Sequence, residues 1–197
     1  TAEAFPQARD YLDVYDRHGL VGPRSVFAHG VHLTTRNFTR LAEAGSAIAF
    51  CPTSNLFLGS GLFDMAEAEA SGVKLGLGTD VGGGTSFSLM TTAAEAYKVC
   101  QLRGHTLSPL KAFYLATLGG ARALGLGDKI GNLAPGSEAD FLVLDLAATP
   151  LLTRRLAAAR SLEEKLFALM VLGDDRAVEA TFVAGALAHR RDPAFQT

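Results

Sequence analysis

The sequence predicts an α/β fold, in which short parallel strands alternate with helices, followed by a smaller β-rich segment. Apolar runs at 25–28, 47–51 and 74–78 are each followed by a helical pattern that leads toward the next run. About 20 residues of loop and helix separate these runs, a spacing typical of a TIM barrel or a doubly wound sheet. A TIM barrel needs eight strands, so these runs alone cannot close one. The first part of the chain is therefore predicted to be part of a barrel or a small open sheet.

Helices are predicted between and after these strands from their amphipathic patterns and their end residues. Thr34 or Thr35 is a suitable N-cap for a helix at 35–44, and a glycine follows several of the helical patterns. Pro52 ends the strand at 47–51. The predicted helices span 8–18, 35–44, 62–71, 87–103 and 109–124.

The pattern changes after Gly125. Residues 130–145 combine a Pro-Gly turn with a strongly apolar strand. A helix is predicted at 161–172, where Ser161 is the N-cap and Glu164 has the spacing of a capping box. Residues 180–188 predict a hairpin that turns at Ala184-Gly185. These strands lie outside the βα rhythm and predict a small β-rich appendage.

Composition and charge exclude several classes of protein. The chain has 197 residues, 48% hydrophobic and 19% charged, as expected for a globular protein with a large core. A net charge of −2 provides no general attraction to nucleic acid or to anionic membranes. The longest apolar runs, at 46–51 and 141–146, are too short to span a bilayer, and the opening residues do not resemble a signal peptide. Cys51 and Cys100 match no metal motif, so we expect reduced thiols in a cytoplasmic protein.

Two candidate functional residues follow strands of the predicted parallel sheet. Asp80 ends the segment Gly76-Leu-Gly-Thr-Asp80 and precedes a glycine-rich loop, a place where an acid can bind a metal or transfer a proton. The alternative is that Asp80 only caps a helix or orders a turn. A phosphate-binding loop is disfavoured, because no Lys-Ser/Thr pair follows the glycines. His29 follows the strand at 25–28, a position that also favours a functional role. The alternative is that His29 is a structural, hydrogen-bonded histidine near a core.

The remaining candidates are assigned structural or surface roles. His32 is three residues from His29 and falls on the opposite face of an extended strand, so a shared metal is not expected. Cys51 lacks an evident base and is not expected to be a nucleophile. Ser54 and Asn55 either line a pocket or satisfy a turn, and we expect a structural role for them. His18, His105 and His189 are expected on the surface.

Three motifs occur in the order found in the metal-dependent amidohydrolases, and the sequence resembles that superfamily. They are Ala28-His29-Gly30, Cys51-Pro-Thr-Ser-Asn55 and Gly76-Leu-Gly-Thr-Asp80-Val-Gly-Gly-Gly. Residues 130–133 and 136–140 resemble the segment where these chains leave the barrel for a β-sandwich. The triple glycine, Ser86-Phe-Ser88, Ala116-Thr-Leu-Gly-Gly120 and Leu172-Gly-Asp-Asp-Arg176 resemble the guanine deaminases within the superfamily. The resemblance covers nearly the whole chain.

The resemblance implies a fold and a set of roles. The fold is the C-terminal part of a TIM (β/α)8 barrel, with strands six to eight in a partial barrel at 1–128. Part of a small β-sandwich with a helix follows at 129–190, and a tail at 191–197. Asp80 would be a zinc ligand at strand eight, and His29 would hydrogen-bond the attacking hydroxide without binding zinc. The implied reaction converts guanine, a purine substrate, to xanthine and ammonia in a cytoplasmic homodimer.

The sequence departs from this family in the residues that it lacks. It contains no His-x-His pair and no His-x-x-Glu before His29, whereas a catalytic zinc site needs about three protein ligands. Because Thr1 lies in helical sequence and is not methionine, we expect a missing N-terminal barrel half, as an upstream segment or a separate chain. We expect the 197-residue chain alone neither to hold zinc tightly nor to deaminate guanine.

Several alternatives to a guanine deaminase remain open. An adenosine-type or triazine-type aminohydrolase is the nearest alternative among enzymes. A fragment without catalytic activity that acts as an interaction or assembly module is the alternative of another class. The cytidine-deaminase fold is disfavoured because the chain lacks Pro-Cys-x-x-Cys.

Overall fold

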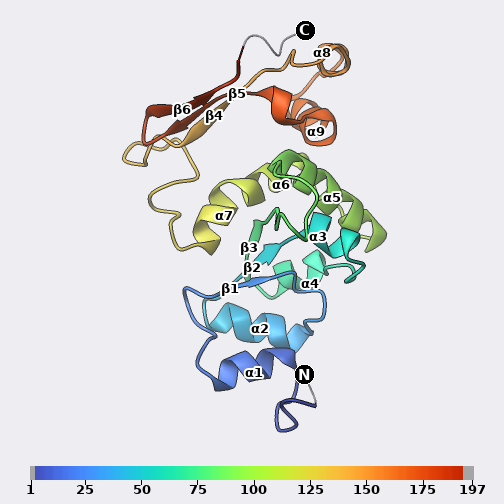
Figure 1. Ribbon diagram of the computed structural model, residues 1–197, viewed down its shortest axis with the longest axis vertical. Helices are drawn as coiled ribbons and strands as arrows, with labels where there is room; N and C mark the ends of the chain where they lie inside the picture. Colours follow the sequence, from blue (N-terminus) through green and yellow to red (C-terminus); the bar gives the residue numbers. More distant parts are fainter. Residues whose placement is uncertain (1–2, 193–197) are drawn as a thin grey trace.

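The computed structural model describes residues 3–192, and part of the predicted tail at 191–197 lies outside them. Two sheets form, one at the centre of the lower part of the molecule and one near its top (Figure 1). The first sheet contains β1 (Val26–Ala28), β2 (Ala47–Phe50) and β3 (Lys74–Leu77), which are parallel and lie in this order. The predicted parallel βα arrangement is therefore confirmed.

Nine α-helices occur within the described residues. Their bounds are α1 (Tyr11–Arg17), α2 (Thr35–Glu43), α3 (Pro52–Phe57), α4 (Met65–Ala70), α5 (Leu89–Leu102), α6 (Pro109–Ala116), α7 (Leu118–Ala123), α8 (Pro150–Ala157) and α9 (Leu162–Leu172). In Figure 1, α1 and α2 lie below the parallel sheet, α5 and α6 lie above it, and α4 and α7 flank the strands on opposite sides. Helices α6 and α7 contact β3, whereas Val26 of β1 is 42% exposed, so the helices cover the sheet in part.

Side-chain caps decide where several helices begin. The helix predicted at 8–18 begins at Tyr11, because the Asp10 carboxylate accepts a hydrogen bond from the Asp13 backbone N–H. The helix predicted at 62–71 begins at Met65, because Asp64 caps it in the same way. Both predicted starts were therefore too early. Capping by Ser161 was predicted and is confirmed, since its side chain accepts from the Glu164 backbone N–H.

Three further differences separate the predicted helices from the observed ones. The single helix predicted at 109–124 is two helices, α6 and α7, because Thr117 leaves the helical conformation with φ −127° and ψ −104°. Helix α3 was missed because its six residues are too few to show a helical period. Helix α8 was also missed, although Thr149 caps it and Pro150 occupies its first turn.

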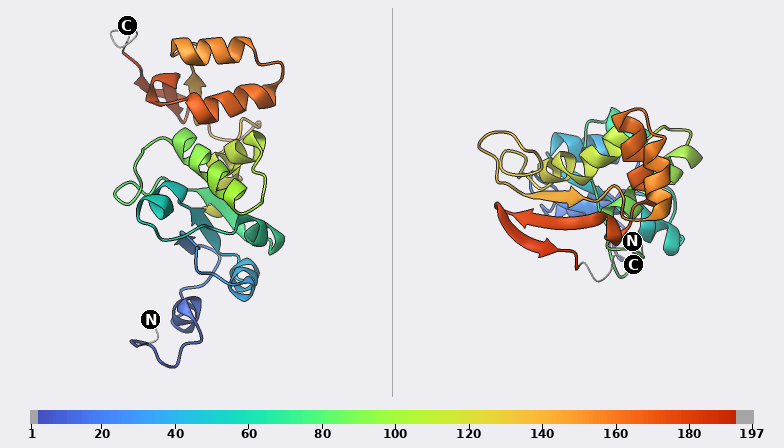
Figure 2. Two further views of the ribbon diagram at one scale, coloured as in Figure 1. Left: turned by 90° about the vertical axis from the view of Figure 1, so that its right-hand side faces the viewer. Right: turned by 90° about the horizontal axis from the view of Figure 1, so that it is seen from above.

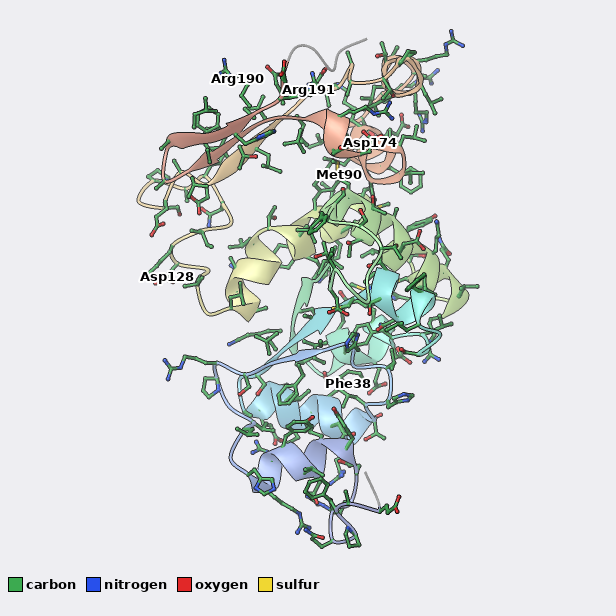
Figure 3. All side chains as sticks on the ribbon, viewed as in Figure 1. Phe38, Met90, Asp128, Asp174, Arg190 and Arg191 are labelled. Carbon is green, nitrogen blue, oxygen red and sulfur yellow. The ribbon has the colours of Figure 1, made fainter. Side chains whose placement is uncertain are left out.

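The core between the sheet and its helices is built from aromatic and aliphatic side chains. Phe38 from α2, Phe50 from β2 and Phe63 are each at most 2% exposed. The Phe63 ring contacts the Phe38 ring edge-on at a centroid distance of 6.0 Å, and the Phe50 ring at 4.7 Å. Figure 3 places Phe38 at the level of the lower helices. This core fixes the strands whose ends carry the candidate residues.

The second sheet is antiparallel and consists of β4 (Phe141–Leu144), β5 (Val178–Val183) and β6 (Ala186–Arg190). The predicted hairpin turn is confirmed: Ala184 and Gly185 both have positive φ, 50° and 79°, as a two-residue hairpin turn requires. The Phe141 and Phe182 rings stack across β4 and β5 at 4.6 Å. Within residues 3–192 this is the one antiparallel sheet.

Helix α9 connects the two parts of the molecule. It packs against α5 and α6 on one side and against α8 on the other. The Tyr97 and Phe167 rings meet edge-on at 5.3 Å across α5 and α9. Met90 and Asp174 lie at the same junction in Figure 3, and the side view in Figure 2 shows the helices between the two sheets. No helix among the described residues is long and apolar enough to cross a membrane.

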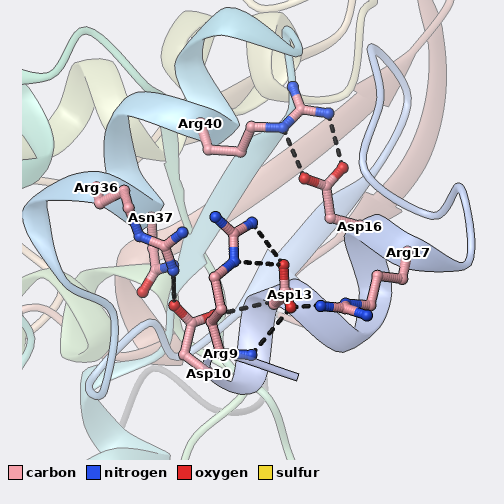
Figure 4. A network of polar contacts seen from close by, with 8 residues as sticks. All are labelled: Arg9, Asp10, Asp13, Asp16, Arg17, Arg36, Asn37 and Arg40. Atoms are coloured by element: carbon pink, nitrogen blue, oxygen red, sulfur yellow. Dashed lines mark hydrogen bonds and ion pairs between the residues drawn. The ribbon is translucent and has the colours of Figure 1, made fainter. Parts of the chain in front are cut away.

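A network of ion pairs joins α1 to α2 (Figure 4). The buried Asp13 carboxylate accepts from the Arg9 guanidinium at 2.6 Å and from the Arg17 guanidinium at 2.7 Å. Arg40 forms two hydrogen bonds with Asp16, at 2.7 and 2.8 Å, across the two helices. The hydrogen bonds from Arg9 hold the pKa of Asp13 far below its usual range, with a further contribution from Arg17.

We expect Asp13→Asn to lower the urea midpoint of the protein at neutral pH. A carboxylate whose pKa is depressed by folding stabilises the protein above its unfolded pKa, near 4, and loses that effect as the pH falls toward the folded value. The difference in midpoint between wild type and variant should therefore narrow below about pH 4. Glu95→Gln, which breaks an exposed ion pair with Lys98, is the control and should shift the midpoint little at any pH. A difference that stays constant from pH 3 to 7 would contradict this account.

Candidate active site

Three neighbouring strands of the parallel sheet end beside the candidate site. His29 directly follows β1, helix α3 begins after Cys51 at the end of β2, and Asp80 follows β3 by three residues. Because parallel strands end at the same edge of a sheet, these three segments converge. The residues that the sequence singled out therefore come from adjacent strand ends.

Both candidate residues have a left-handed backbone conformation. His29 has φ 70° and Asp80 has φ 48°, and within residues 3–192 the one other non-glycine residue of this kind is Ala184 in the hairpin turn. Such conformations are uncommon for residues other than glycine and are concentrated at functional sites. The His29 N–H still donates to the Ala49 carbonyl at 3.0 Å, so the turn begins within the β1–β2 ladder.

The side chains of His29 and Asp80 face each other. His29 Nε2 lies 3.8 Å from Asp80 Oδ2, and the two side chains are 41% and 40% exposed. This separation exceeds that of a direct hydrogen bond, which ends near 3.2 Å for these atoms. Both groups remain accessible to a third species that could contact both.

Asn55 contacts the other side of the His29 ring. Its Oδ1 lies 2.8 Å from His29 Nδ1, and Asn55 is 1% exposed. Asn55 lies in α3, on the segment that follows the strand next to β1. The sequence favoured a structural role for Asn55, with lining a pocket as the alternative, and did not predict this contact with His29. One feature of the sequence could have indicated this contact: Asn55 follows β2, the strand between those that precede His29 and Asp80.

Cys51 completes a cluster of groups that can bind a metal. One nitrogen of His29, the Cys51 sulfur and one oxygen of Asp80 all lie within 4.8 Å of one another. The Cys51 thiol is buried and donates to the Ala49 carbonyl at 3.3 Å. Burial raises the pKa of this thiol, so it is a poor nucleophile, in line with the sequence expectation.

The glycine loop after Asp80 packs tightly on the start of α3. A Cβ at Gly84 would lie 1.9 Å from the Thr79 carbonyl oxygen and 2.9 Å from Thr53 Oγ1. A Cβ at Gly83 would lie 2.7 Å from Ser54 Oγ and 3.2 Å from Asp80 Oδ2. The backbone can therefore approach α3 and hold Asp80 in place only because these positions lack side chains.

The other histidines lie outside this cluster. His32, His18 and His189 are exposed, as the sequence predicted. His105 is part of a separate ion-pair group, where its Nε2 lies 3.3 Å from a Glu69 oxygen. His29 itself lines a groove of about 520 Å³ beside β1, together with Tyr11, Tyr15 and others.

The sequence model of the Amidohydrolase family matches residues 1–188. The chain therefore belongs to the amidohydrolase family. It is 54% identical over 188 residues to guanine deaminase from Escherichia coli, a match that covers 95% of this chain and 43% of that protein. The chain spans less than half the length of the curated relatives that it matches.

Solved structures of guanine deaminases have the same fold. The E. coli enzyme superposes with a TM-score of 0.95 at 53% identity, covering 97% of this chain and 45% of that one. A guanine deaminase from C. acetobutylicum with guanine bound in its active site gives 0.81 at 29% identity, covering 94% and 44%. An adenosine deaminase from Xanthomonas campestris with bound zinc gives 0.80 at 28% identity, covering 94% and 42%. The parallel part of this chain is accordingly a partial barrel, and its family implies a metal cofactor.

We expect Gly84→Ala to disrupt the loop that holds Asp80. The added Cβ would meet backbone atoms that cannot move aside without displacing β3, so the free energy of unfolding should fall by about 1–3 kcal/mol. Gly22→Ala is the matched control, because no heavy atom lies within 4 Å of its Cβ and its φ is not left-handed. Urea unfolding measures both variants. Equal stability of the two would show that the close packing of the loop is unimportant.

Proposed function

We propose that this chain supplies His29 and Asp80 to the active site of a zinc-dependent guanine deaminase. The observation that carries the proposal is the 3.8 Å approach of His29 Nε2 to Asp80 Oδ2 from neighbouring strand ends, with both groups accessible. The identity to guanine deaminases over nearly the whole chain supports the choice of substrate. The reaction is hydrolytic: guanine and water give xanthine and ammonia.

The residues at the site fit a zinc ion. Nitrogen, sulfur and carboxylate oxygen are the donor atoms that zinc binds in proteins, and here all three lie within 4.8 Å of one another. We assign Asp80 as the ligand from this chain, because its carboxylate is accessible whereas the Cys51 sulfur is buried. Zinc, when bound, supplies the Lewis acidity that makes water acidic enough to ionise near neutral pH.

In the proposed reaction, His29 and Asp80 contact the attacking water and have different roles. Asp80 Oδ2 accepts a proton from that water, since a carboxylate beside the reacting oxygen is a suitable base. His29 Nε2 accepts a hydrogen bond from the water and so orients it toward the ring carbon that bears the amino group. Their separation of 3.8 Å leaves room for an oxygen atom to contact both groups.

Other parts of the protein complete this site in the proposal. The parallel strands β1, β2 and β3 correspond to barrel strands six, seven and eight, within a barrel part at 1–128. An N-terminal barrel half, upstream or on a companion chain, provides the remaining metal ligands. Residues 129–190 contribute to a β-sandwich, of which β4, β5 and β6 form one sheet. The exposed apolar side chains of β4, such as Leu142, support such a neighbour.

We also propose that the complete protein is a cytoplasmic homodimer that acts in purine catabolism. One observation supports the cytoplasm: Cys51 and Cys100 are both free and buried. Burial raises the pKa of Cys100 to about 11, which keeps its thiol protonated and resistant to oxidation.

The test uses the complete protein that carries this chain, assayed on guanine, adenosine and ammelide and analysed for metal. We expect turnover of guanine in preference to the other two. Asp80→Asn should lose both metal and activity, whereas His29→Gln should keep the metal and lower kcat by at least about 100-fold. His18→Gln, on the exposed surface, is the control and should keep wild-type activity.

Three results would contradict the proposal, each in its own way. Preference for adenosine or ammelide would favour an adenosine-type or triazine-type aminohydrolase. If the protein turns over none of the three substrates but binds another protein, an interaction module would be favoured. Loss of metal in His29→Gln would show that His29 is a ligand.

A further inference from the structure

We propose that Asn55 is a positioning residue, which fixes His29 with its proton on Nδ1 and leaves Nε2 as a hydrogen-bond acceptor opposite Asp80. This inference rests on the function proposed above and extends it to a residue that does not touch the reacting atoms. It follows from four observations on Asn55: its contact, its rigidity, its unpaired amide and its place in the sheet order.

The contact determines which nitrogen of His29 is protonated. Asn55 Oδ1, 2.8 Å from Nδ1, can only accept a hydrogen bond, so Nδ1 must donate. A neutral imidazole carries one proton, so Nε2 then has a free lone pair. That lone pair is directed to the side of Asp80 Oδ2, 3.8 Å away. Asn55 thereby gives His29 an acceptor, rather than a donor, on its reactive side.

The backbone of Asn55 is held at both ends. Its N–H donates to the Cys51 carbonyl at 3.0 Å, and its own carbonyl accepts from the Ser60 N–H at 2.8 Å. Pro52 occupies the first turn of α3, where its fixed φ favours the helix. The side chain is 1% exposed and cannot turn toward solvent. Asn55 is therefore rigid enough to orient a ring that is itself 41% exposed.

The unpaired amide of Asn55 shows that stability alone does not explain this residue. Asn55 Nδ2 is buried without a hydrogen-bond partner among the described residues. A buried amide N–H without a partner costs about 1–3 kcal/mol, whereas an apolar side chain of the same shape, such as leucine, would avoid this cost. The one directed contact made by the Asn55 side chain in residues 3–192 is with His29. Asn55 therefore lowers the stability of the core, while its Oδ1 orients the His29 ring.

The order of the strands places Asn55 where this contact is possible. His29 follows β1, Asn55 follows β2, and Asp80 follows β3, in the spatial order of the sheet. Asn55 and Asp80 therefore contact the His29 ring through its two different nitrogens, Nδ1 and Nε2. The hydrogen bond to Asn55 at Nδ1 gives the ring one orientation, in which Nε2 faces Asp80.

The first test measures the protonation of His29 directly in the complete protein. Ring 15N chemical shifts of histidine distinguish a protonated from an unprotonated nitrogen, and His29→Gln identifies the His29 signals. We expect protonated Nδ1 and unprotonated Nε2 in wild type, and a mixture of the two forms in Asn55→Leu. An unprotonated Nδ1 in neutral wild-type His29 would overturn the inference. This readout is independent of the substrate, so it stands whether or not guanine is turned over.

The second test separates positioning from stability. In Asn55→Leu we expect kcat to fall about 10- to 100-fold while KM and the unfolding temperature change little. Asn55→Asp keeps an oxygen acceptor at the same place and should restore part of the lost kcat. Asn37→Leu is the matched control, because Asn37 is 4% exposed and its side chain bonds Thr34 and Asp10, remote from His29. It should lower the unfolding temperature and leave kcat unchanged.

The outcomes distinguish this inference from the proposed function. If wild type deaminates guanine and Asn55→Leu keeps the wild-type kcat, the positioning role is wrong and the proposed function stands. If wild type does not deaminate guanine, the proposed function is wrong, and the 15N shifts alone decide whether Asn55 fixes His29. Equal losses of kcat in Asn55→Leu and Asn55→Asp would also contradict the role of the oxygen acceptor.

Discussion

The candidate site depends on how His29 is held. Its backbone N–H donates to the Ala49 carbonyl, the last bond that joins β1 to β2 at this edge, and its backbone then turns into the left-handed region. Its ring meets Asn55 through Nδ1 and faces Asp80 through Nε2. A shift of β1 against β2 by one residue would reverse every side chain of the strand and remove both contacts. The contacts that His29 makes at the site therefore depend on the register between β1 and β2.

Packing on both sides of His29 holds the ends of the strands in fixed positions. Aromatic side chains fill the space between the sheet and the lower helices, with Phe63 between Phe38 and Phe50. On the other side, the loop after Asp80 packs on α3 through glycines that leave no room for a side chain. Rigid packing of this kind allows half-exposed polar groups to keep a defined separation, which catalysis requires.

Elements that local sequence patterns determine were predicted well, whereas boundaries that a single side chain or backbone break determines were not. The three parallel strands and the hairpin turn were predicted well, because apolar runs and turn residues are local patterns. Errors occurred where a capping side chain or a single backbone break decides the boundary, as at Asp10, Asp64 and Thr117. Helix α3 is too short to show a helical period, so the sequence left open whether Asn55 lines a pocket or satisfies a turn and favoured a structural role.

The sequence by itself determined which residues stand at strand ends, because a buried strand and the polar residue that follows it are adjacent in the chain. It thus identified His29 and Asp80 and the family to which they point. Only the tertiary structure decided that these two approach within 3.8 Å and that Asn55 holds the far side of the imidazole. The physical reason is that hydrogen bonds between residues 26 positions apart depend on strand order and register, which no local pattern records.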